Sequence, residues 1–346
     1  MEGLLPAAES GLWVVIYVVA VLVATAIVWV GSDKLESSSE RLSTYYELPA
    51  IVQGAIVVAV GSSFPELSTT VLSTLIHGEF ELGVAAIVGS AIFNIIVIPG
   101  IAGLAGEEQL ESNRDLVYKE AQFYMISVSV LLLTFSFAVI YHPLPGEDIL
   151  GEMTRLLALI PVSLYLLYLF VQYQDTMEYQ PEPHGEEIRP LRQWGLLLLS
   201  LVIIVVGVEI LVRAAVGLGK FFETPSFFWG ITVVAAGTSI PDAFVSVQAA
   251  REGKAVTSIA NVLGSNIFDL LVAIPAGVLI AGTAAINYSI AAPMMGVLTL
   301  ATILLFLFMR TRMILSRFES WLLLAVYVGF VVWMGLESFG LTGVIL

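Results

Sequence analysis

Apolar residues run along this chain in blocks that are long enough to cross a lipid bilayer. A membrane-spanning helix needs about 20 mostly apolar residues, and ten segments of the sequence meet this requirement. They lie near residues 12–34, 46–76, 81–104, 117–141 and 153–173, and then near 194–217, 223–252, 255–282, 288–309 and 318–342. The pattern therefore predicts an all-α membrane protein with ten transmembrane helices.

Composition agrees with a lipid environment and narrows the range of partners. Of the 346 residues, 58% are hydrophobic and 12% are charged, more apolar surface than a soluble fold can cover. A net charge of −15 argues against a nucleic-acid partner, because phosphate binding depends on clustered Lys and Arg. The lipid bilayer is the expected partner, and no obligatory protein partner or cofactor is indicated. The chain has no cysteine, and we expect its three histidines, His77, His142 and His184, to be solvated in loops rather than to bind zinc.

Lysine and arginine are distributed unevenly between the two sides of the predicted topology. Eleven of them fall in loops on one side, and three, Arg155, Arg213 and Lys220, fall on the other. Cytoplasmic loops carry the excess of Lys and Arg in membrane proteins. The count predicts an integral protein of the cell membrane with both termini on the extracytoplasmic side.

A polar stretch from Gln174 to Gln193, which contains three prolines, separates two sets of five spans. We interpret residues 1–173 as a first five-helix repeat, 174–193 as a cytoplasmic linker and 194–346 as a second five-helix repeat. Each half has an odd number of spans, so the second half must enter the membrane with the opposite orientation.

The two halves contain the same motifs. Ala59-Val-Gly-Ser-Ser-Phe-Pro-Glu66 returns 176 residues later as Ala235-Ala-Gly-Thr-Ser-Ile-Pro-Asp242. Gly89-Ser-Ala-Ile-Phe-Asn94 returns 175 residues later as Gly264-Ser-Asn-Ile-Phe-Asp269. Inverted repeats of this kind are typical of secondary transporters, whose sites form near the bilayer midplane where the halves meet.

The second and seventh spans are too long to cross as straight helices. Gly61 and Pro65 in one, and Gly237 and Pro241 in the other, predict where they bend or break, because proline lacks an amide hydrogen and clashes with the carbonyl four residues back. Such an interruption releases backbone carbonyls for another partner. We expect these to be the carbonyls of Gly61 and Gly237 and of neighbours such as Ala59 and Ala235.

Carboxylates stand next to these interruptions. Glu66 and Asp242 follow the two prolines, and Asp269 and Asn94 occupy matching positions in the eighth and third spans. A charge in mid-membrane costs a few kcal/mol and usually marks a pathway or an ion pair. No Lys or Arg lies at comparable depth in the sequence, so a cationic cargo is the simplest source of positive charge.

Hydroxyl side chains accompany the carboxylates at Ser62, Ser63, Ser90, Thr238, Ser239 and Ser265. This all-oxygen set suits a hard cation such as calcium, which takes about six to eight oxygen ligands, whereas transition metals favour imidazole or thiolate. Gly89 and Gly264 are expected to let helices approach closely. Asp33 and Glu209, also 176 residues apart, lie near span ends and are expected to act as caps or at the membrane interface.

The paired motifs resemble the two α-repeats of the cation/calcium exchanger superfamily, and the ten-span plan covers the whole chain. The resemblance implies a sodium/calcium exchanger in which the second, third, seventh and eighth spans surround the site and the first and sixth slide as a gate. It implies that Glu66 and Asp242 are the central calcium ligands. It further implies that the calcium and sodium sites are completed by Asn94, Asp269, the hydroxyls of Ser62, Ser63, Ser90, Thr238, Ser239 and Ser265, and the carbonyls of Ala59 and Ala235.

The resemblance is to the simple prokaryotic type, with some likeness to the potassium-dependent branch. Glu66 is matched by Asp242 rather than by a second Glu, and Gly237-Thr-Ser-Ile-Pro-Asp242 is closer to that branch. Asp269 would bring the site to a charge of −3, which one calcium ion leaves at −1. Either a potassium ion binds with calcium or one carboxyl keeps a proton, and we favour the proton because the chain is compact.

The functional hypothesis is a secondary antiporter, not an enzyme, that exchanges sodium for calcium by alternating access. A proton/calcium exchanger, a potassium-dependent sodium/calcium exchanger and a cation channel remain alternatives. An intramembrane aspartyl protease would need two facing catalytic aspartates, and the repeated motif does not favour it.

Overall fold

Long apolar helices make up most of the structure, a computed structural model that describes residues 7–46, 59–105, 110–111, 115–146, 149–175, 188–253, 255–311 and 313–343. Nine helices within these residues are long and apolar enough to cross a membrane. They confirm nine of the ten predicted spans. The remaining span, near 46–76, includes residues 47–58, which lie outside the described residues, and its second part is the helix α3 (Phe64–Leu75).

The long helices have well-defined bounds, and several continue beyond the segments that hydropathy predicted. They are α1 (Ala7–Tyr45), α4 (Phe80–Ala105), α5 (Ala121–Tyr141, preceded by the π-helical turn η2, Asp115–Glu120), α6 (Arg155–Asp175), α7 (Pro190–Phe222), α12 (Tyr288–Arg310) and α13 (Arg317–Ser338). The eighth span joins α10 (Ala255–Phe268), the π-helical turn η4 (Asp269–Ala273) and α11 (Ile274–Ala281). A helix pairs most of its backbone groups within itself, as a membrane interior requires.

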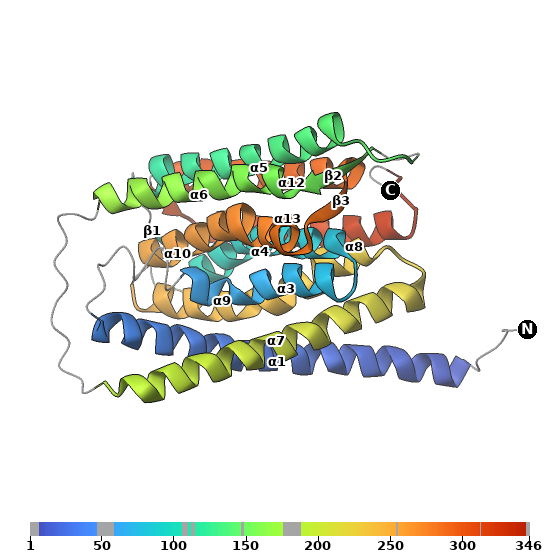
Figure 1. The fold of residues 1–346 in the computed structure, drawn as a ribbon. Coiled ribbons are helices and arrows are strands. Elements are labelled where there is room, and N and C mark those ends of the chain that lie inside the picture. Colours follow the sequence, from blue (N-terminus) through green and yellow to red (C-terminus); the bar gives the residue numbers. More distant parts are fainter. Residues whose placement is uncertain are drawn as a thin grey trace, which may run out of the picture.

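The helices α1 and α7 form a crossed pair along the lower side of the bundle in Figure 1. With 39 and 33 residues they extend about 58 and 50 Å, longer than the hydrocarbon core. They cross at Gly31 and Gly207, which are 176 residues apart. A Cβ on Gly31 would lie 2.6 Å from a carbon of Ile204, and one on Gly207 would lie 2.9 Å from a carbon of Val28. Side chains at these positions would push the pair apart.

The helix α4 lies at the centre of the molecule and is buried along almost its whole length. It packs against α3, α9, α12 and α13, while α5, α6 and α12 cover the side of the bundle opposite α1 and α7 (Figure 1). A helix that is apolar all round and surrounded by other helices is expected at the core of a membrane bundle. This central position makes α4 the scaffold on which motifs from both halves meet.

Two small antiparallel sheets, which hydropathy did not predict, close the two ends of the bundle. At one end β1 (Leu110–Glu111) pairs with β4 (Ile314–Leu315), and at the other β2 (Leu150–Thr154) pairs with β3 (Thr283–Asn287). The strands β1 and β3 each follow the third span of their half, and β2 and β4 each precede the fifth span of theirs. In both sheets a strand of the first kind pairs with a strand of the second kind from the other half. Equivalent sheets at opposite ends of the bundle (Figure 1) are what an inverted repeat produces.

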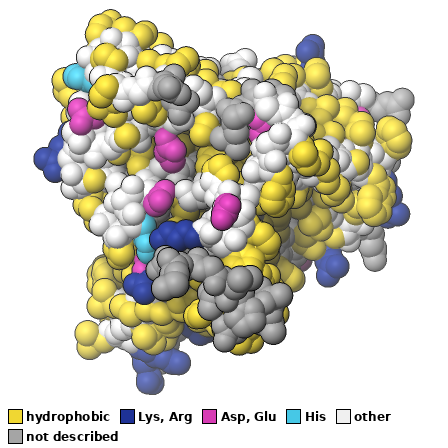
Figure 2. Space-filling model, turned by 90° about the vertical axis from the view of Figure 1, so that its right-hand side faces the viewer, with side chains coloured by type: hydrophobic (Ala, Val, Ile, Leu, Met, Phe, Trp, Pro, Cys, Tyr) yellow, Lys and Arg dark blue, Asp and Glu magenta, His cyan; other side chains and the backbone are white. Residues whose placement is uncertain are grey.

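Acidic side chains lie on the end of the bundle that carries β2 and β3 (Figure 2). The end that carries β2 and β3 is shown in Figure 2, where Asp and Glu side chains are scattered over the face and hydrophobic side chains cover its edges. The helices α1 and α6 end, and α7 and α13 begin, at the opposite end. The predicted linker, 174–193, runs mostly through residues 176–187, which are outside the described residues.

The predicted break in the second span is confirmed, and the one in the seventh span is wrong in position. The short helix α2 (Ala59–Ser62) stops at Ser63, and α3 begins at Phe64, so Pro65 occupies the first turn, where its missing amide hydrogen costs little. In the other half α9 (Ala235–Arg251) runs through both Gly237 and Pro241. The irregular backbone lies upstream, in α8 (Ser226–Trp229) and the π-helical turn η3 (Gly230–Val234). Packing by neighbouring helices lets a membrane helix tolerate a proline.

Candidate functional site

The second motif of the first half, on α4, meets the first motif of the second half, on the seventh span. Gly89 allows this contact, because a Cβ there would lie 2.3 Å from the carbonyl oxygen of Ile231 and 2.8 Å from the Cβ of Ala235. For Gly264 the same expectation stays a prediction, because Ala55, the residue that corresponds to Ile231 in the other half, lies outside the described residues. Among the described residues, the Tyr168 hydroxyl comes within 4 Å of its added Cβ, at 3.9 Å.

Hydroxyl side chains from the two halves pair with one another inside the bundle. Ser62 Oγ lies 3.1 Å from Ser265 Oγ, and Ser90 Oγ lies 2.6 Å from Ser239 Oγ. Ser63 Oγ reaches the Ser265 carbonyl oxygen at 3.5 Å. In every case a residue of the first motif of one half (Gly-Ser-Ser-Phe-Pro-Glu or Gly-Thr-Ser-Ile-Pro-Asp) contacts a residue of the second motif of the other half.

The carboxylates that the sequence singled out are also brought together. Glu66 and Asp269 are 2% and 1% exposed, whereas Asp242 is partly exposed. Ser90 Oγ donates a hydrogen bond of 3.4 Å to Glu66 Oε1. All three carboxylates lie within electrostatic range of one another, and no described lysine or arginine forms an ion pair with them.

Two more hydroxyls support the carboxylates. Thr238 lies within hydrogen-bonding reach of Glu66, and Ser63 within reach of Asp269. Thr238 Oγ1 also approaches the Ala235 carbonyl oxygen at 3.2 Å. Ala59 is the first residue of α2, one turn before the break. Hydroxyl side chains from both repeats thus lie beside the carboxylates.

Three buried oxygens of the site have no hydrogen-bond partner among the described residues. They are Glu66 Oε2, Asn94 Oδ1 and Asp269 Oδ1. All three are acceptors, and a buried acceptor without a partner costs about 1–3 kcal/mol. A cation among them would offset that cost, because each oxygen presents lone pairs and no proton.

Asn266 orients one of these oxygens, and the sequence analysis missed it. Asn94 Nδ2 donates a hydrogen bond of 3.0 Å to Asn266 Oδ1, which leaves Asn94 Oδ1 available. Asn266 itself is fully buried and donates to the Ala91 carbonyl oxygen at 3.3 Å and to the Tyr124 hydroxyl at 3.4 Å. Its counterpart in the first half is Ala91, so a search for matching polar residues passed over it, although it lies within the second motif.

The geometry limits the kind of metal site that is possible. Among the described residues, no three His, Cys, Asp or Glu side chains converge closely enough to hold a metal ion by themselves. Any cation site here must therefore mix carboxylates with hydroxyl, amide and carbonyl oxygens. That mixture is the environment of hard cations such as calcium and sodium.

Other polar groups of the sequence analysis lie away from this site. His142 is exposed, as expected, and His184 lies outside the described residues. The expectation for His77 is wrong, because its Nε2 lies 3.2 Å from Glu209 Oε2 in a partly buried pair that Arg213 joins through the same carboxylate. Since Glu209 binds these side chains, it connects the end of α3 to α7. Asp33, its counterpart, is exposed.

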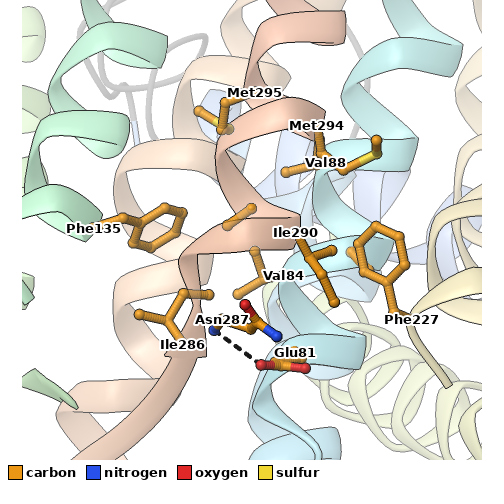
Figure 3. Close-up of a pocket in the computed structure, with 12 residues that line it drawn as sticks. Glu81, Val84, Val88, Phe135, Phe227, Ile286, Asn287, Ile290, Met294 and Met295 are labelled. Atoms are coloured by element: carbon orange, nitrogen blue, oxygen red, sulfur yellow. Dashed lines mark hydrogen bonds between the residues drawn. The ribbon is translucent and has the colours of Figure 1, made fainter. Parts of the chain in front are cut away.

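A separate small cavity contains none of the predicted residues. It lies between α4 and the start of α12 (Figure 3), where Glu81 Oε1 accepts a hydrogen bond of 2.9 Å from the Asn287 backbone N–H. Its other lining residues are apolar. With a volume of about 10 Å³ it has room for about one water molecule. Glu81 here connects α4 to the last residue of β3.

Comparison with known proteins matches nearly the whole chain. A family model described as sodium/calcium exchanger protein matches residues 16–174 and 192–336. The sodium/calcium exchanger MaX1 of Methanosarcina acetivorans is 23% identical over 339 residues, covering 87% of this chain and 93% of that protein. Human sodium/potassium/calcium exchanger 4 is 38% identical over 109 residues, covering 31% of this chain and 17% of that protein. The structure of the sodium–calcium exchanger NCX_Mj soaked with 2.5 mM Na⁺ and 10 mM Sr²⁺ has a TM-score of 0.58 and 25% identity, covering 92% of this chain and 99% of that one.

Proposed function

Because this chain belongs to the sodium/calcium exchanger protein family, we propose that it is a secondary antiporter that exchanges sodium for calcium at one buried site between its two halves. Family membership makes it a cation/calcium exchanger of the membrane and not an enzyme. The finer proposal is carried by the buried, unpartnered oxygens of Glu66, Asn94 and Asp269. They come from both halves, so a cation bound among them would bridge the repeats.

In this proposal Glu66 and Asp242 are the central calcium ligands. Both follow the proline of their repeat, and they supply charge from opposite sides of the site. The remaining ligands for calcium and sodium are Asn94, Asp269, the hydroxyls of Ser62, Ser63, Ser90, Thr238, Ser239 and Ser265, and the carbonyls of Ala59 and Ala235. The pairing of hydroxyls across the repeats supports this set, because a cation would replace hydrogen bonds that already converge there.

Alternating access would expose this site to one side of the membrane at a time. The crossed helices α1 and α7 are the proposed gate, since they lie outside the four helices that carry the motifs. Their contact at Gly31 and Gly207 is made by glycine and aliphatic side chains. An apolar contact without hydrogen bonds can shift along its length at low cost, which suits a sliding element.

Sodium and calcium would compete for the same carboxylates, so that binding of one empties the site for the other. With three carboxylates, three sodium ions neutralise the site but one calcium ion leaves one negative charge. We favour a proton on one carboxyl in the calcium-bound state. A bound potassium ion is the alternative, which the similarity to human sodium/potassium/calcium exchanger 4 supports.

The proposal includes a topology and a division of the chain. Both termini are placed outside the cytoplasm of the cell membrane, because eleven of the fourteen Lys and Arg residues fall on the other side. Residues 1–173 and 194–346 are the two five-helix repeats, joined by the cytoplasmic linker 174–193. A tag at either terminus should then be reached by protease only from the outside of intact cells.

Reconstituted protein tests the function. Proteoliposomes loaded with sodium should take up calcium when diluted into sodium-free buffer, and an equal pH gradient without sodium should drive little uptake. Uptake driven by the pH gradient alone would instead identify a proton/calcium exchanger. Calcium flux that needs no counter-ion would identify a channel and contradict the proposal.

A further inference from the structure

One face of α1 is polar over the half that ends at Tyr45. Ser32, Glu36, Ser39 and Ser43 are spaced four, three and four residues apart, so they lie along one side of the helix. Ser32, Ser39 and Ser43 are 7%, 6% and 1% exposed, and Glu36 is partly buried. The face is therefore turned into the protein, although its residues are those of a solvated surface.

This face meets the candidate site. A Cβ on Gly61 would lie 3.9 Å from Glu36 Cα and 3.9 Å from Ser39 Oγ, so the α1 backbone passes beside the first motif of the first half. The Glu36 carboxylate lies within electrostatic range of Asp242, the one partly exposed carboxylate of the site. Ser32 Oγ is buried and has no hydrogen-bond partner among the described residues.

The matching face of α7 has a different chemistry. The residues 176 positions after the four polar ones are Val208, Val212, Ala215 and Gly219. The first three are fully buried and belong to the apolar core between α1 and α7. Apolar residues thus serve helix packing at the equivalent place, and packing alone gives no reason for a carboxylate and three serines on α1.

We propose that this α1 face, Ser32, Glu36, Ser39 and Ser43, lines the cation path between the site and the end of the bundle where α1 stops, and that Glu36 is a fourth carboxylate that holds an incoming cation before Asp242. The inference rests on the proposed exchange function and assigns it a one-sided access path. A carboxylate on a narrow path with low-dielectric walls concentrates cations and speeds their arrival. The apolar face of α7 offers no equivalent on the opposite side.

Cysteine accessibility tests the path without any transport assay. The chain has no cysteine, so a single Ser39→Cys variant reports on one position only. In membrane vesicles this cysteine should react with impermeant thiosulfonate reagents from the α1 C-terminal side and not from the other. A cationic reagent should react roughly tenfold faster than an anionic one, and adding Glu36→Gln should remove that preference.

The matched control is Ala215→Cys, at the equivalent position of α7, which should stay unreactive from both faces. The path is excluded if the Ser39→Cys protein is unreactive from both sides. The role of Glu36 is excluded if the preference for the cationic reagent survives Glu36→Gln.

Transport measurements then test what Glu36 does. Glu36→Gln should raise the half-saturating calcium concentration on the α1 C-terminal side by roughly tenfold. The half-saturating calcium concentration on the other side should stay unchanged. Glu40→Gln removes an exposed carboxylate one turn further along α1 and should behave as the wild type. If Glu36→Gln does not fold, Glu36→Asp keeps the charge and should retain the wild-type affinity.

The outcomes separate the two proposals. Wild-type protein without sodium-driven calcium uptake overturns the proposed exchange, whatever the labelling shows. Wild-type protein that exchanges, with a Glu36→Gln variant of equal calcium affinity on both sides, overturns only the role of Glu36.

Discussion

Gly61-Ser-Ser-Phe-Pro-Glu66 and Gly237-Thr-Ser-Ile-Pro-Asp242 have nearly the same sequence and different backbones. The first is interrupted at Ser63, so its proline begins a new helix, and the second continues as one helix through its proline. Their carboxylates differ as well, since Glu66 is enclosed and Asp242 is partly exposed. Two copies of one motif can thus place the same types of side chain on different backbone conformations.

The packing beside the two motifs differs as well. A Cβ on Gly237 would lie 2.8 Å from Leu211 Cδ2 and 3.0 Å from Thr25 Oγ1, so α9 is held tightly against α1 and α7. A Cβ on Gly61 would meet nothing closer than 3.9 Å among the residues that the structure describes. Among the described residues, the neighbours of the second copy therefore lie closer to its glycine than those of the first copy do.

The largest expected effect is loss of transport when either motif carboxylate is neutralised. Glu66→Gln and Asp242→Asn should each abolish sodium-driven calcium uptake in proteoliposomes, because fewer charges remain to replace the hydration of calcium. Glu252→Gln, an exposed carboxylate at the end of α9, is the control and should transport normally. Near-normal uptake by either of the first two variants would refute their assignment as calcium ligands.

Changes of side-chain length make this comparison sharper. Asp242→Glu should keep measurable uptake, because the partly exposed position has space for one more methylene. Glu66→Asp should lose it, because the shorter carboxylate withdraws from Ser90, whose hydroxyl lies 3.4 Å from Glu66 Oε1. Equal activity of the two variants would show that the difference in enclosure has no functional consequence.

The next effect is on affinity, through the amide that has no polar counterpart in the first half. Asn266→Ala removes the hydrogen bond that orients Asn94 and should raise the half-saturating calcium concentration about 10–100-fold, as is typical when a partner of a metal ligand is lost. Maximal uptake at saturating calcium should change little. A normal affinity in this variant would mean that Asn94 is oriented by other contacts or does not bind calcium.

A smaller effect, on stability, is expected from Gly89 in the second motif. Gly89→Ala should destabilise the protein by about 1–3 kcal/mol, because its Cβ would lie 2.3 Å from the Ile231 carbonyl oxygen and the backbone must move. Gly329→Ala is the control and should be close to neutral, because an added Cβ at this position of α13 would meet nothing within 4 Å among the described residues. Thermal unfolding in detergent measures both, and equal melting temperatures of the two variants would contradict the tight contact at Gly89.

The last prediction concerns potassium and Asp269, whose counterpart in the first half is the neutral Asn94, and the expected effect on uptake is none. Replacing potassium with choline should leave sodium-driven calcium uptake by the wild type unchanged if a carboxyl keeps a proton. Uptake that collapses without potassium would overturn this preference. If Asp269→Asn then restored uptake in choline, Asp269 would be identified as the potassium ligand.

Much of the architecture could be predicted because membrane helices follow a rule that is local in sequence. Nine of the ten spans were confirmed, since a long apolar stretch must form a helix in lipid. The ends of the helices were less predictable, as polar residues continue α1 to Tyr45 beyond the hydrocarbon core. The small sheets at the two ends pair strands that are about 130 to 205 residues apart, and no local sequence pattern predicts such pairs.

The sequence alone determined the duplicated motifs, their inverted orientation and the all-oxygen chemistry of the buried groups, because repetition and residue type are written along the chain. Only the tertiary structure decided that Ser62 pairs with Ser265 and Ser90 with Ser239, that Asn266 orients Asn94, and that Glu36 lies beside the site. It also placed the irregular backbone of the seventh span upstream of its proline. The physical reason is that these contacts join different helices, and which helices meet depends on packing around α4, which the order of residues along any one helix does not contain.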